Sequence, residues 1–398
     1  MKFPESWLRQ HVKVEASSED LAARLTAIGL EVEDAQPIGA ALEGVVVAEI
    51  LSCARHPDAE RLQVCQVSVG GAEPLQIVCG APNARAGLKA PLATVGATIP
   101  GGMQIKPAKL RGVDSNGMLC SAKELEIDPD ASGLLELPAD APVGTPLAGY
   151  LGLPDRAFEL KLTPNRADCF SVRGVAFDVA AAFGAQVEAL QIPVARVGIQ
   201  DELSIELNAG ADCPRYCGRL VEGLDATARS PLWLTEKLKR AGIRPVSPLV
   251  DITQFVMLEL GQPMHAFDAD TLRGPVGVRR AREGESVKTL DERECALTPE
   301  FLVITDADRP IALAGVDGRL GHACHRRHDA GVPGKRAFRA VGNHWPFAQT
   351  GPAHRRLAPF RARRGPGAAA LRAGARDRAR AADHGRHRRP DHRGRAHE

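Results

Sequence analysis

The sequence lacks a hydrophobic segment long enough to cross a membrane, because its 398 residues contain no run of about 18 apolar residues. The first residues, MKFPESWLRQHV, include no apolar stretch of the signal-peptide type. The nine cysteines have no paired spacing, and their number is odd. We therefore expect neither a membrane span nor a disulfide framework, and we predict a cytoplasmic protein with reduced thiols.

Several catalytic signatures are absent as well. The sequence has no nucleophile elbow, no phosphate-binding P-loop and no motif with paired metal ligands before residue 317. These absences argue against a serine hydrolase with a nucleophile elbow, a P-loop nucleotidase, and a metalloenzyme whose ligands form a recognisable sequence motif. Any chemistry must come from residues that the fold brings together.

Charge is divided unevenly along the chain. The formal net charge is +2, but residues 1–316 contain 31 Lys and Arg against 43 Asp and Glu. Residues 317–398 contain 20 against 6, and nineteen of those 20 are arginine. Nine of the twelve histidines also follow Val316. So abrupt a change indicates that the two parts have different origins.

Turn residues and hydrophobic patterns divide the beginning of the chain into two units. Residues 1–38 are predicted to form a small α/β segment, in which Ser17 caps a helix that Gly29 ends. Residues 39–148 contain five short β-rich runs separated by Gly, Pro and Asn. Five strands over such a length are typical of an OB-fold barrel. A small immunoglobulin-like sandwich is the alternative.

The next part of the chain is mixed α and β. Residues 149–200 are predicted to contain a helix capped by Asp168. Residues 201–316 are predicted to form a further α/β domain, with a helix that Ser230 caps and strands in VGVRRA, SVKTL and FLVITDA. The expected fold class is a multidomain α+β protein.

A basic stretch, KPAKLRGVDSNGMLCSAKEL, lies in the predicted barrel. Its cations are Lys106, Lys109, Arg111 and Lys123. On an OB-fold such a face can follow a phosphate backbone, which predicts nucleic-acid binding. The alternative is a solvated surface, because acidic residues lie nearby and residues 1–316 are acidic on average. Binding would therefore need a local patch rather than attraction by the whole molecule.

A second constellation, VSPLVDITQFVMLELGQPMHAFDAD, surrounds His265. Its polar neighbours in sequence are Asp251, Thr253, Gln254 and Asp268. A histidine with a threonine and an acid can activate water for hydrolysis, acting as the base or as the group that orients the water. The alternative is a buried histidine bonded to the backbone.

Three segments of the predicted barrel together resemble a known module. HPDAERLQVCQV (56–67), IVCGAPNARAG (77–87) and the basic stretch resemble the tRNA-binding OB module of several synthetases and of free-standing tRNA-binding proteins. Within this module, His56 is expected to make a structural hydrogen bond rather than to take part in catalysis.

Other segments extend the resemblance to one family. MKFPESWLRQHV, LTPNRADCFSVRGVA, LVDITQFVMLELGQPMHAFD and PIALAGV resemble, in order, segments of the β subunit of bacterial phenylalanyl-tRNA synthetase. The resemblance covers residues 1–316, whereas a tRNA-binding module would account for residues 44–127 alone. It implies that the barrel is inserted in the N-terminal unit and that residues 149–200 continue this unit.

The resemblance implies a heterotetramer of two α and two β subunits that attaches phenylalanine to tRNA(Phe). The α subunit would hold ATP, Mg²⁺ and phenylalanine, and this chain is expected to bind no metal or nucleotide itself. The β subunit would bind tRNA and hydrolyse mischarged Tyr-tRNA(Phe). Such a second site is physically reasonable, because an apolar pocket rejects one added hydroxyl poorly.

The implied editing pocket lies in a truncated B3/B4-type domain over residues 201–316. His265 and Thr253 would be its catalytic residues, with His265 orienting the ester or the attacking water. The residues that would line the pocket are Gln254, Ala314 and Gly315. Gln254 stands where the family has asparagine.

The resemblance ends at Val316, where the family continues with a Met-Gly-Gly turn and this chain does not. If each codon is read one base later, Asp317–Gly321, Val332–Arg336 and Thr350–Pro366 can encode family segments in order. This predicts a frameshift after Val316, a truncated and incomplete chain, and a disordered tail over residues 317–398. The cysteine and histidines of HACHRRH are accordingly expected to form no metal site.

Two rival functions stay open. One is a stand-alone tRNA-binding module, and the other is a free-standing deacylase that clears mischarged tRNA in trans. Both predict a native end near residue 320. A long reading frame that continues in the shifted frame would exclude both.

Overall fold

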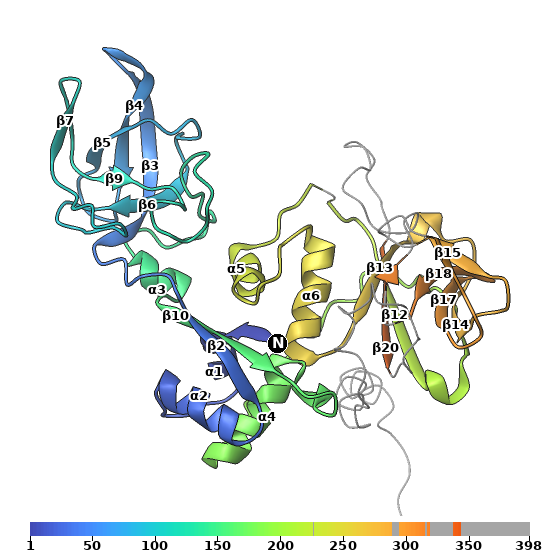
Figure 1. Ribbon diagram of the computed structural model, residues 1–398. Helices are drawn as coiled ribbons and strands as arrows, with labels where there is room; N and C mark the ends of the chain where they lie inside the picture. The colour runs from blue at the N-terminus through green and yellow to red at the C-terminus, as the bar shows by residue number, and fades with distance from the viewer. Residues whose placement is uncertain (226, 289–293, 315–316, 319–336, 344–398) are drawn as a thin grey trace, which may run out of the picture.

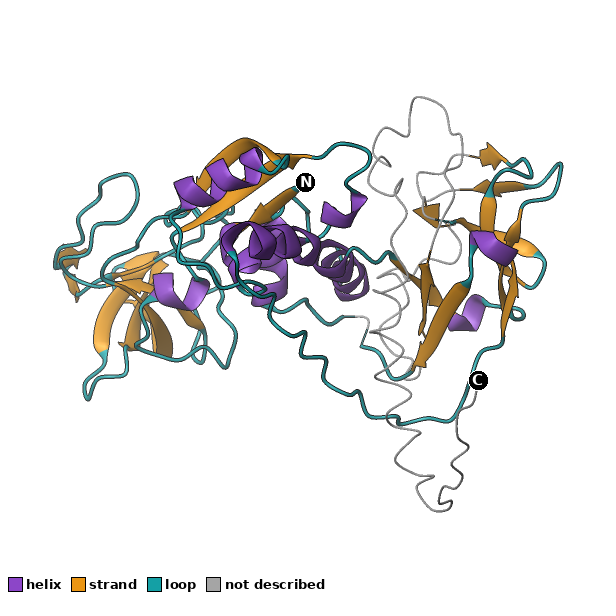
Figure 2. Cartoon of the chain, turned by 90° about the horizontal axis from the view of Figure 1, so that it is seen from below, coloured by secondary structure: helices purple, strands orange, loops and turns teal. Residues whose placement is uncertain are grey.

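The computed structural model describes residues 1–225, 227–288, 294–314, 317–318 and 337–343. A small β-barrel lies at one end of the molecule and a β-rich part at the other (Figure 1). Helices gather between them, as Figure 2 shows from a view at right angles. Within the described part of the chain, every helix is too short or too polar to span a membrane.

The N-terminal unit is built from two stretches of chain that flank the barrel. Its antiparallel sheet has the order β1 (Lys2–Pro4), β10 (Asp155–Lys161), β2 (Glu31–Ile38). Because β10 follows the barrel in sequence and lies between two strands that precede it, the barrel is an insertion in this unit. The predicted insertion is confirmed.

The helices of this unit are α1 (Glu5–Arg9), α2 (Ser18–Ala27) and α4 (Val172–Phe183). They pack on the sheet around a buried core that includes Phe3, Trp7, Leu21, Phe158 and Val175. The predicted cap of α2 is confirmed, because the Ser17 hydroxyl accepts a hydrogen bond from the Asp20 N–H at 3.0 Å.

The predicted cap of α4 is wrong. The Ser171 hydroxyl, not the Asp168 carboxylate, accepts from the Gly174 N–H at 3.0 Å. Asp168 instead lies in the short 3₁₀ turn η1 (Ala167–Cys169) and pairs with the guanidinium of Arg166. A charged partner nearby outcompetes the helix end for this carboxylate.

The barrel is one strongly bent antiparallel sheet. Its order is β5 (Leu75–Cys79), β4 (Ala59–Ser68), β3 (Val45–His56), β6 (Lys89–Ala93), β9 (Met118–Leu119). A register irregularity between Ile50 and Ser52 lets β3 pair with β6 along its first half and with β4 along its second. Since β9 also lies against β5, the sheet nearly closes. An OB-type barrel, and not a two-sheet sandwich, is confirmed.

A hairpin and a short helix complete this domain. The hairpin is β7 (Ala108–Leu110) with β8 (Val113–Ser115), and the helix is α3 (Leu147–Leu151). The hairpin rises beside the β3–β4 loop at the end of the barrel that faces away from the rest of the molecule (Figure 1).

The remaining part contains two larger sheets and a hairpin. One sheet has the order β11 (Ile205–Asn208), β14 (Val276–Arg280), β17 (Leu302–Asp306), β18 (Arg309–Leu313), β19 (Asp317–Gly318). The other has the order β12 (Arg215–Val221), β20 (Ala337–Asn343), β13 (Met264–Asp268), and the hairpin is β15 (Ser286–Lys288) with β16 (Glu294–Ala296). Two 3₁₀ turns connect strands, η2 (Gly210–Asp212) and η3 (Ala269–Thr271). The three strands predicted in VGVRRA, SVKTL and FLVITDA are β14, β15 and β17.

Two helices of this part, α5 (Leu232–Arg240) and α6 (Pro248–Leu260), pack against the N-terminal unit. The Phe255 ring stacks on Trp7 with centroids 5.2 Å apart. The predicted cap Ser230 is displaced by one residue, since Pro231 holds the cap position and the Ser230 hydroxyl bonds the buried Asp251 carboxylate. This use of Asp251 anchors the start of α5 to α6.

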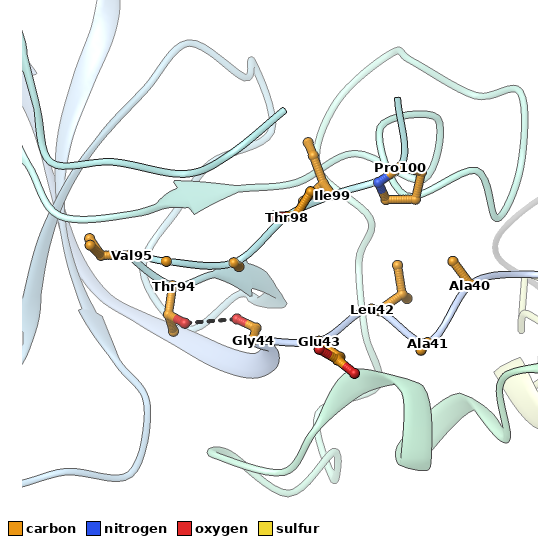
Figure 3. Close-up of a pocket in the computed structure, with 12 residues that line it drawn as sticks. Ala40, Ala41, Leu42, Glu43, Gly44, Thr94, Val95, Thr98, Ile99 and Pro100 are labelled. Atoms are coloured by element: carbon orange, nitrogen blue, oxygen red, sulfur yellow. Dashed lines mark hydrogen bonds between the residues drawn. The ribbon is translucent and has the colours of Figure 1, made fainter. Parts of the chain in front are cut away.

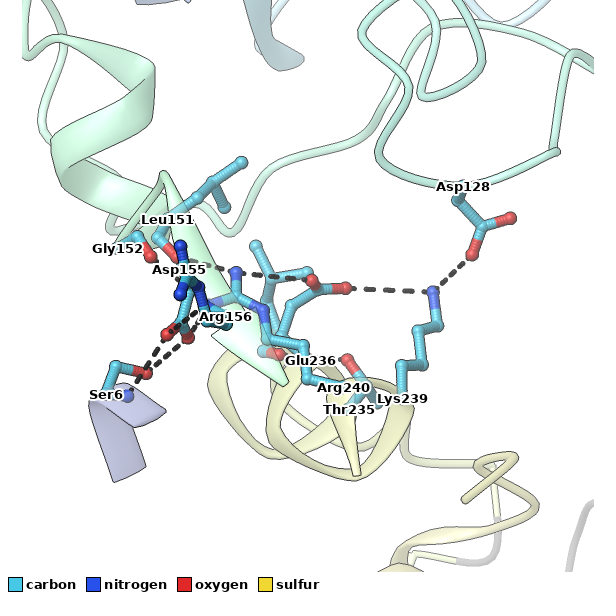
Figure 4. A network of polar contacts seen from close by, with 11 residues as sticks. Ser6, Asp128, Leu151, Gly152, Asp155, Arg156, Thr235, Glu236, Lys239 and Arg240 are labelled. Atoms are coloured by element: carbon cyan, nitrogen blue, oxygen red, sulfur yellow. Dashed lines mark hydrogen bonds and ion pairs between the residues drawn. The ribbon is translucent and has the colours of Figure 1, made fainter. Parts of the chain in front are cut away.

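Polar contacts join α5 to both neighbouring units (Figure 4). Arg240 donates to the Leu151 carbonyl at 2.7 Å and pairs with Asp155 of β10 at 3.3 Å. Lys239 pairs with Asp128 in a barrel loop at 2.6 Å. Helix α5 therefore connects the barrel, the N-terminal sheet and the second half of the chain.

Two short pieces of the segment predicted to be disordered are strands. Asp317–Gly318 pairs with β18, and Ala337–Asn343 fits between β12 and β13. Among the strands that the structure describes, β12 and β13 pair only with β20, so each of them presents an edge to this one extended segment. Cys324, His325 and His328 lie outside the described residues.

Candidate nucleic-acid interface and hydrolytic pocket

The predicted basic stretch folds mainly into the β7–β8 hairpin. Lys109 lies in β7, Arg111 lies in its turn with φ at 46°, and Lys106 precedes the hairpin. All three are exposed, and none forms an ion pair with any residue that the structure describes. Three free cations on a projecting ribbon are chemically suited to phosphate oxygens.

Lys123 is exposed but lies in a separate turn after β9. Its neighbour Glu124 is occupied, because its carboxylate accepts from the N–H and hydroxyl of Ser121 at 2.7 Å each. Asp114 is the direct cross-strand partner of Lys109. The structure thus groups Lys106, Lys109 and Arg111 and does not place Lys123 on the same ribbon.

His56 is structural, as predicted, and it contacts this hairpin. Its Nδ1 accepts from the Asp58 N–H at 3.0 Å, and its Nε2 lies 3.1 Å from the Leu110 carbonyl oxygen. The side chain is buried. His56 is the last residue of β3, and sequence reasoning did not identify its partner Leu110, which is 54 residues away.

A hollow of about 470 Å³ lies where the barrel joins the N-terminal unit (Figure 3). It is formed by residues 40–44 and 94–100, and the Thr94 hydroxyl donates to the Gly44 carbonyl at 2.8 Å across it. Glu43 is the one charged residue in its lining. A lining with a carboxylate and no cation does not suit nucleic acid.

His265 lies in β13, and its ring stacks with that of Phe267 at 5.9 Å between centroids. Burial lowers the pKa of His265 to about 4. The imidazole is therefore neutral at pH 7 and can donate one hydrogen bond and accept another.

Thr253 and Gln254 lie in α6, which packs against β13. The Thr253 hydroxyl donates to the Val250 carbonyl at 2.7 Å, which leaves its oxygen lone pairs free to accept. The Gln254 Oε1 is buried and has no hydrogen-bond partner among the described residues. A buried acceptor without a partner is costly in a finished core, so Gln254 is a candidate to contact a ligand.

Ala314 is buried at the end of β18, in the same hydrophobic cluster as Phe267. The fold thereby brings the strand of His265 close to Ala314 and to α6. Gly315, the remaining predicted pocket residue, lies outside the described residues. Asp268 accepts from the Asp270 N–H at 3.1 Å and so caps η3.

Sequence reasoning missed one cluster, in which Asp178 of α4 joins two residues of LTPNRADCF. The ligand-type atoms of Asp168, Cys169 and Asp178 lie within 4.8 Å of one another. The guanidinium of Arg166 contacts both carboxylates and the Cys169 sulfur. Its charge stands where a cation would bind, so the cluster is an ion-pair network that closes the start of α4.

Two family models match the chain. The model described as "Putative tRNA binding domain" matches residues 45–146. The model described as "B3/4 domain" matches residues 212–326.

The matches to curated relatives cover most of this chain but less than half of each relative. A phenylalanine–tRNA ligase beta subunit of Xanthomonas campestris pv. campestris (strain 8004) is 66% identical over 320 residues, which are 80% of this chain and 40% of that protein. One from Xylella fastidiosa (strain 9a5c) is 60% identical over 318 residues, with the same two shares. This chain therefore spans 40% of the length of these relatives.

Solved structures give weaker matches. An N-terminal fragment of the phenylalanyl-tRNA synthetase beta subunit from Pyrococcus horikoshii is 16% identical, with a TM-score of 0.27, and the match covers 48% of this chain and 56% of that one. A MetRS related protein from the same organism is 25% identical with a TM-score of 0.20, and the match covers 25% of this chain and 85% of that one.

Proposed function

We propose that this chain, whose similarity to phenylalanine–tRNA ligase beta subunits extends over 80% of its length, is the tRNA-binding and editing part of such a subunit. One observation carries the proposal. A tRNA-binding domain and a B3/4 domain follow each other in a chain that is 66% identical to one of these subunits over 320 residues.

The complete ligase would act with partners that this chain does not include. We propose an α₂β₂ assembly in the cytoplasm, in which the α subunit uses ATP and Mg²⁺ to attach phenylalanine to tRNA(Phe). The Asp168, Cys169 and Asp178 cluster does not fit Mg²⁺, because the Arg166 guanidinium already contacts all three side chains and a thiol is a poor ligand for this hard ion. No step of the proposal therefore involves a metal bound by this chain.

Editing would hydrolyse the ester that joins tyrosine to tRNA. We propose that the neutral imidazole of His265 orients the attacking water or the ester. A group with a pKa of about 4 is a weak base at neutral pH, which favours orientation over proton abstraction. The lone pairs of Thr253 and the unpartnered Oε1 of Gln254 would accept from the substrate, and Ala314 and Gly315 would line the pocket.

The interface is tested by the double variant Lys106→Ala with Lys109→Ala. Each lost phosphate contact should reduce the magnitude of the slope of log K against log salt by roughly 1. The double variant should therefore bind tRNA more weakly, and the magnitude of its slope should fall by roughly 1 to 2. Fluorescence anisotropy with labelled tRNA(Phe) at several salt concentrations measures both quantities.

The matched control removes the same charge elsewhere, through Lys13→Ala with Lys288→Ala, both exposed and outside the barrel. This control should keep the slope of the unchanged chain. If the two double variants have equal slopes, the hairpin is only a solvated surface.

The half-buried position of His265 and its lowered pKa predict an acid sensitivity. Its pKa is about 4 in the folded chain and about 6.5 when unfolded, so the unfolded state binds more protons between these values. The neutral His265 side chain therefore contributes up to about 3 kcal/mol to the free energy of unfolding above about pH 6.5. This contribution is lost as the pH falls toward 4. Urea unfolding of the unchanged chain and of His265→Phe at pH 7 and pH 4.5 measures this difference. If both lose equal stability on acidification, His265 is not buried as a neutral group.

We also propose that the reading frame shifts between Val316 and Asp317. Similarity to the two relatives covers 320 and 318 residues, close to the 316 that precede the change in composition, although the B3/4 match continues to residue 326. Sequencing codons 305 to 370 from fresh genomic template tests this proposal. A one-base difference that restores Met-Gly-Gly shows that the shift is a sequencing error, whereas an unchanged sequence shows that the shift lies in the gene and that the chain is truncated. The proposal is overturned if the shifted frame after Val316 does not encode the family segments.

A further inference from the structure

We propose that His56 is a positioning residue that holds the turn of the β7–β8 hairpin, and hence Lys109 and Arg111, in place for a phosphate backbone. This inference rests on the proposed tRNA-binding function. It assigns to the buried imidazole one defined task, which is a hydrogen bond across 54 residues to the Leu110 carbonyl.

The hydrogen bonds of His56 determine its tautomer. The Asp58 backbone N–H is a donor, so Nδ1 must accept and carries no proton. A neutral imidazole then carries its proton on Nε2, and the neighbour of Nε2 is the Leu110 carbonyl oxygen, which can only accept. His56 therefore donates to the residue that lies between Lys109 and Arg111.

The hairpin is attached at two places. At its base, Gln76 donates to the Asp114 carbonyl at 2.9 Å, and the Ser115 hydroxyl accepts from the Val78 N–H at 3.1 Å. At its turn, the bond from His56 is the one hydrogen bond that residues 109–112 make outside the hairpin, within the part of the chain that the structure describes. Without it the turn would be held only through its base.

The turn needs such an attachment. Its residues are exposed, and the hairpin forms a two-stranded sheet of its own. An isolated two-stranded hairpin is marginally stable in water. Long cationic side chains on a loose ribbon would lose more conformational freedom on binding, which costs affinity.

Two conservative variants separate the two hydrogen bonds of His56. In His56→Asn the amide oxygen can still accept from the Asp58 N–H, as in an Asx turn, but the side chain is too short to reach Leu110. In His56→Gln the amide nitrogen can still donate to the Leu110 carbonyl, while the acceptor for Asp58 is lost. The proposal requires Gln, and not Asn, to preserve the function.

The experiment measures tRNA(Phe) binding against salt for the unchanged chain, both His56 variants, and Lys109→Ala with Arg111→Ala. We expect His56→Asn to weaken binding by about 10-fold and to lower the salt slope toward that of the double variant, by roughly 1 to 2, because the cations no longer hold their positions. His56→Gln should keep the slope of the unchanged chain. Hydrogen exchange should become faster at residues 109–112 in His56→Asn while the strands β3 and β4 stay protected.

Four results would overturn the proposal. One is an unchanged slope in His56→Asn beside a lowered slope in the double variant, which leaves the tRNA-binding function intact. Another is a lowered salt slope of tRNA binding in His56→Gln, with no lowering in His56→Asn. The third is an unchanged slope in the double variant itself, which removes the proposed function of the hairpin together with this inference. A fall in affinity with uniformly faster exchange over the barrel would also count against it, since that indicates general destabilisation.

Discussion

Gly174→Ala is expected to destabilise the N-terminal unit by at least about 3 kcal/mol, because a methyl group at this position has no space. A Cβ there would lie 1.8 Å from the Asp168 carbonyl oxygen and 2.9 Å from the Ser171 hydroxyl that caps α4. The first of these neighbours is backbone and cannot rotate away. Relief would require η1 to move, together with the Arg166 network. The unfolding midpoint in urea, followed by circular dichroism, measures the effect.

Gly149→Ala is the matched control for this substitution. Gly149 lies in α3, and a Cβ there would meet no atom within 4 Å. Alanine is favoured over glycine inside a helix by up to about 1 kcal/mol, so this variant should be neutral or slightly more stable. Equal destabilisation by the two substitutions would contradict the close packing of α4 on η1.

Arg240→Ala is expected to cost about 3 to 5 kcal/mol, because it removes one partner of a buried ion pair. The side chains of Arg240 and Asp155 are only 9% and 4% exposed. The substitution also removes the donor of the Leu151 and Gly152 carbonyls, and it leaves the Asp155 carboxylate with Ser6 and the Arg156 N–H. Helix α5 should therefore detach from the N-terminal sheet, which equilibrium unfolding and exchange of α5 amides would detect.

Lys239→Ala tests whether burial, rather than charge, explains the cost. Lys239 is the next residue of α5 to the N-terminal side, but its side chain is 42% exposed and that of its partner Asp128 is 27% exposed. Exposed ion pairs contribute at most about 1 kcal/mol, so this variant should stay close to the unchanged chain. A loss as large as that of Arg240→Ala would mean that the barrel, and not the N-terminal sheet, holds α5.

Local patterns along the chain account for much of the fold. The barrel strands were predictable because apolar runs and turn residues alternate along the chain at intervals of about ten residues. Within one such run, the strand backbone itself sets the direction of each side chain. The cap of α2 was predictable for the same reason, since Ser17 and Asp20 are three residues apart. The insertion of the barrel between β2 and β10 came from the family resemblance and not from any local pattern.

The errors also have a physical cause. Asp168 and Ser171 are both good caps by residue type, but Ser171 directly precedes the first residue of α4, whereas Asp168 lies in η1 and pairs with Arg166. The B3/4 match over residues 212–326 includes α5 and α6, and both helices also pack against the N-terminal unit. Their packing follows the apolar surface of Trp7 and the charge of Asp155, which no local pattern reveals.

The sequence by itself determined the β-barrel, the helices α2, α4 and α5, the family resemblance, and the residues that are candidates for binding and hydrolysis. Tertiary structure decided which of these residues meet. His56 and Leu110 are 54 positions apart, and Ser6 and Asp155 are 149 apart. Hydrogen-bond and ion-pair energies depend on distances of a few ångströms in space, and separation along the chain carries almost no information about such distances.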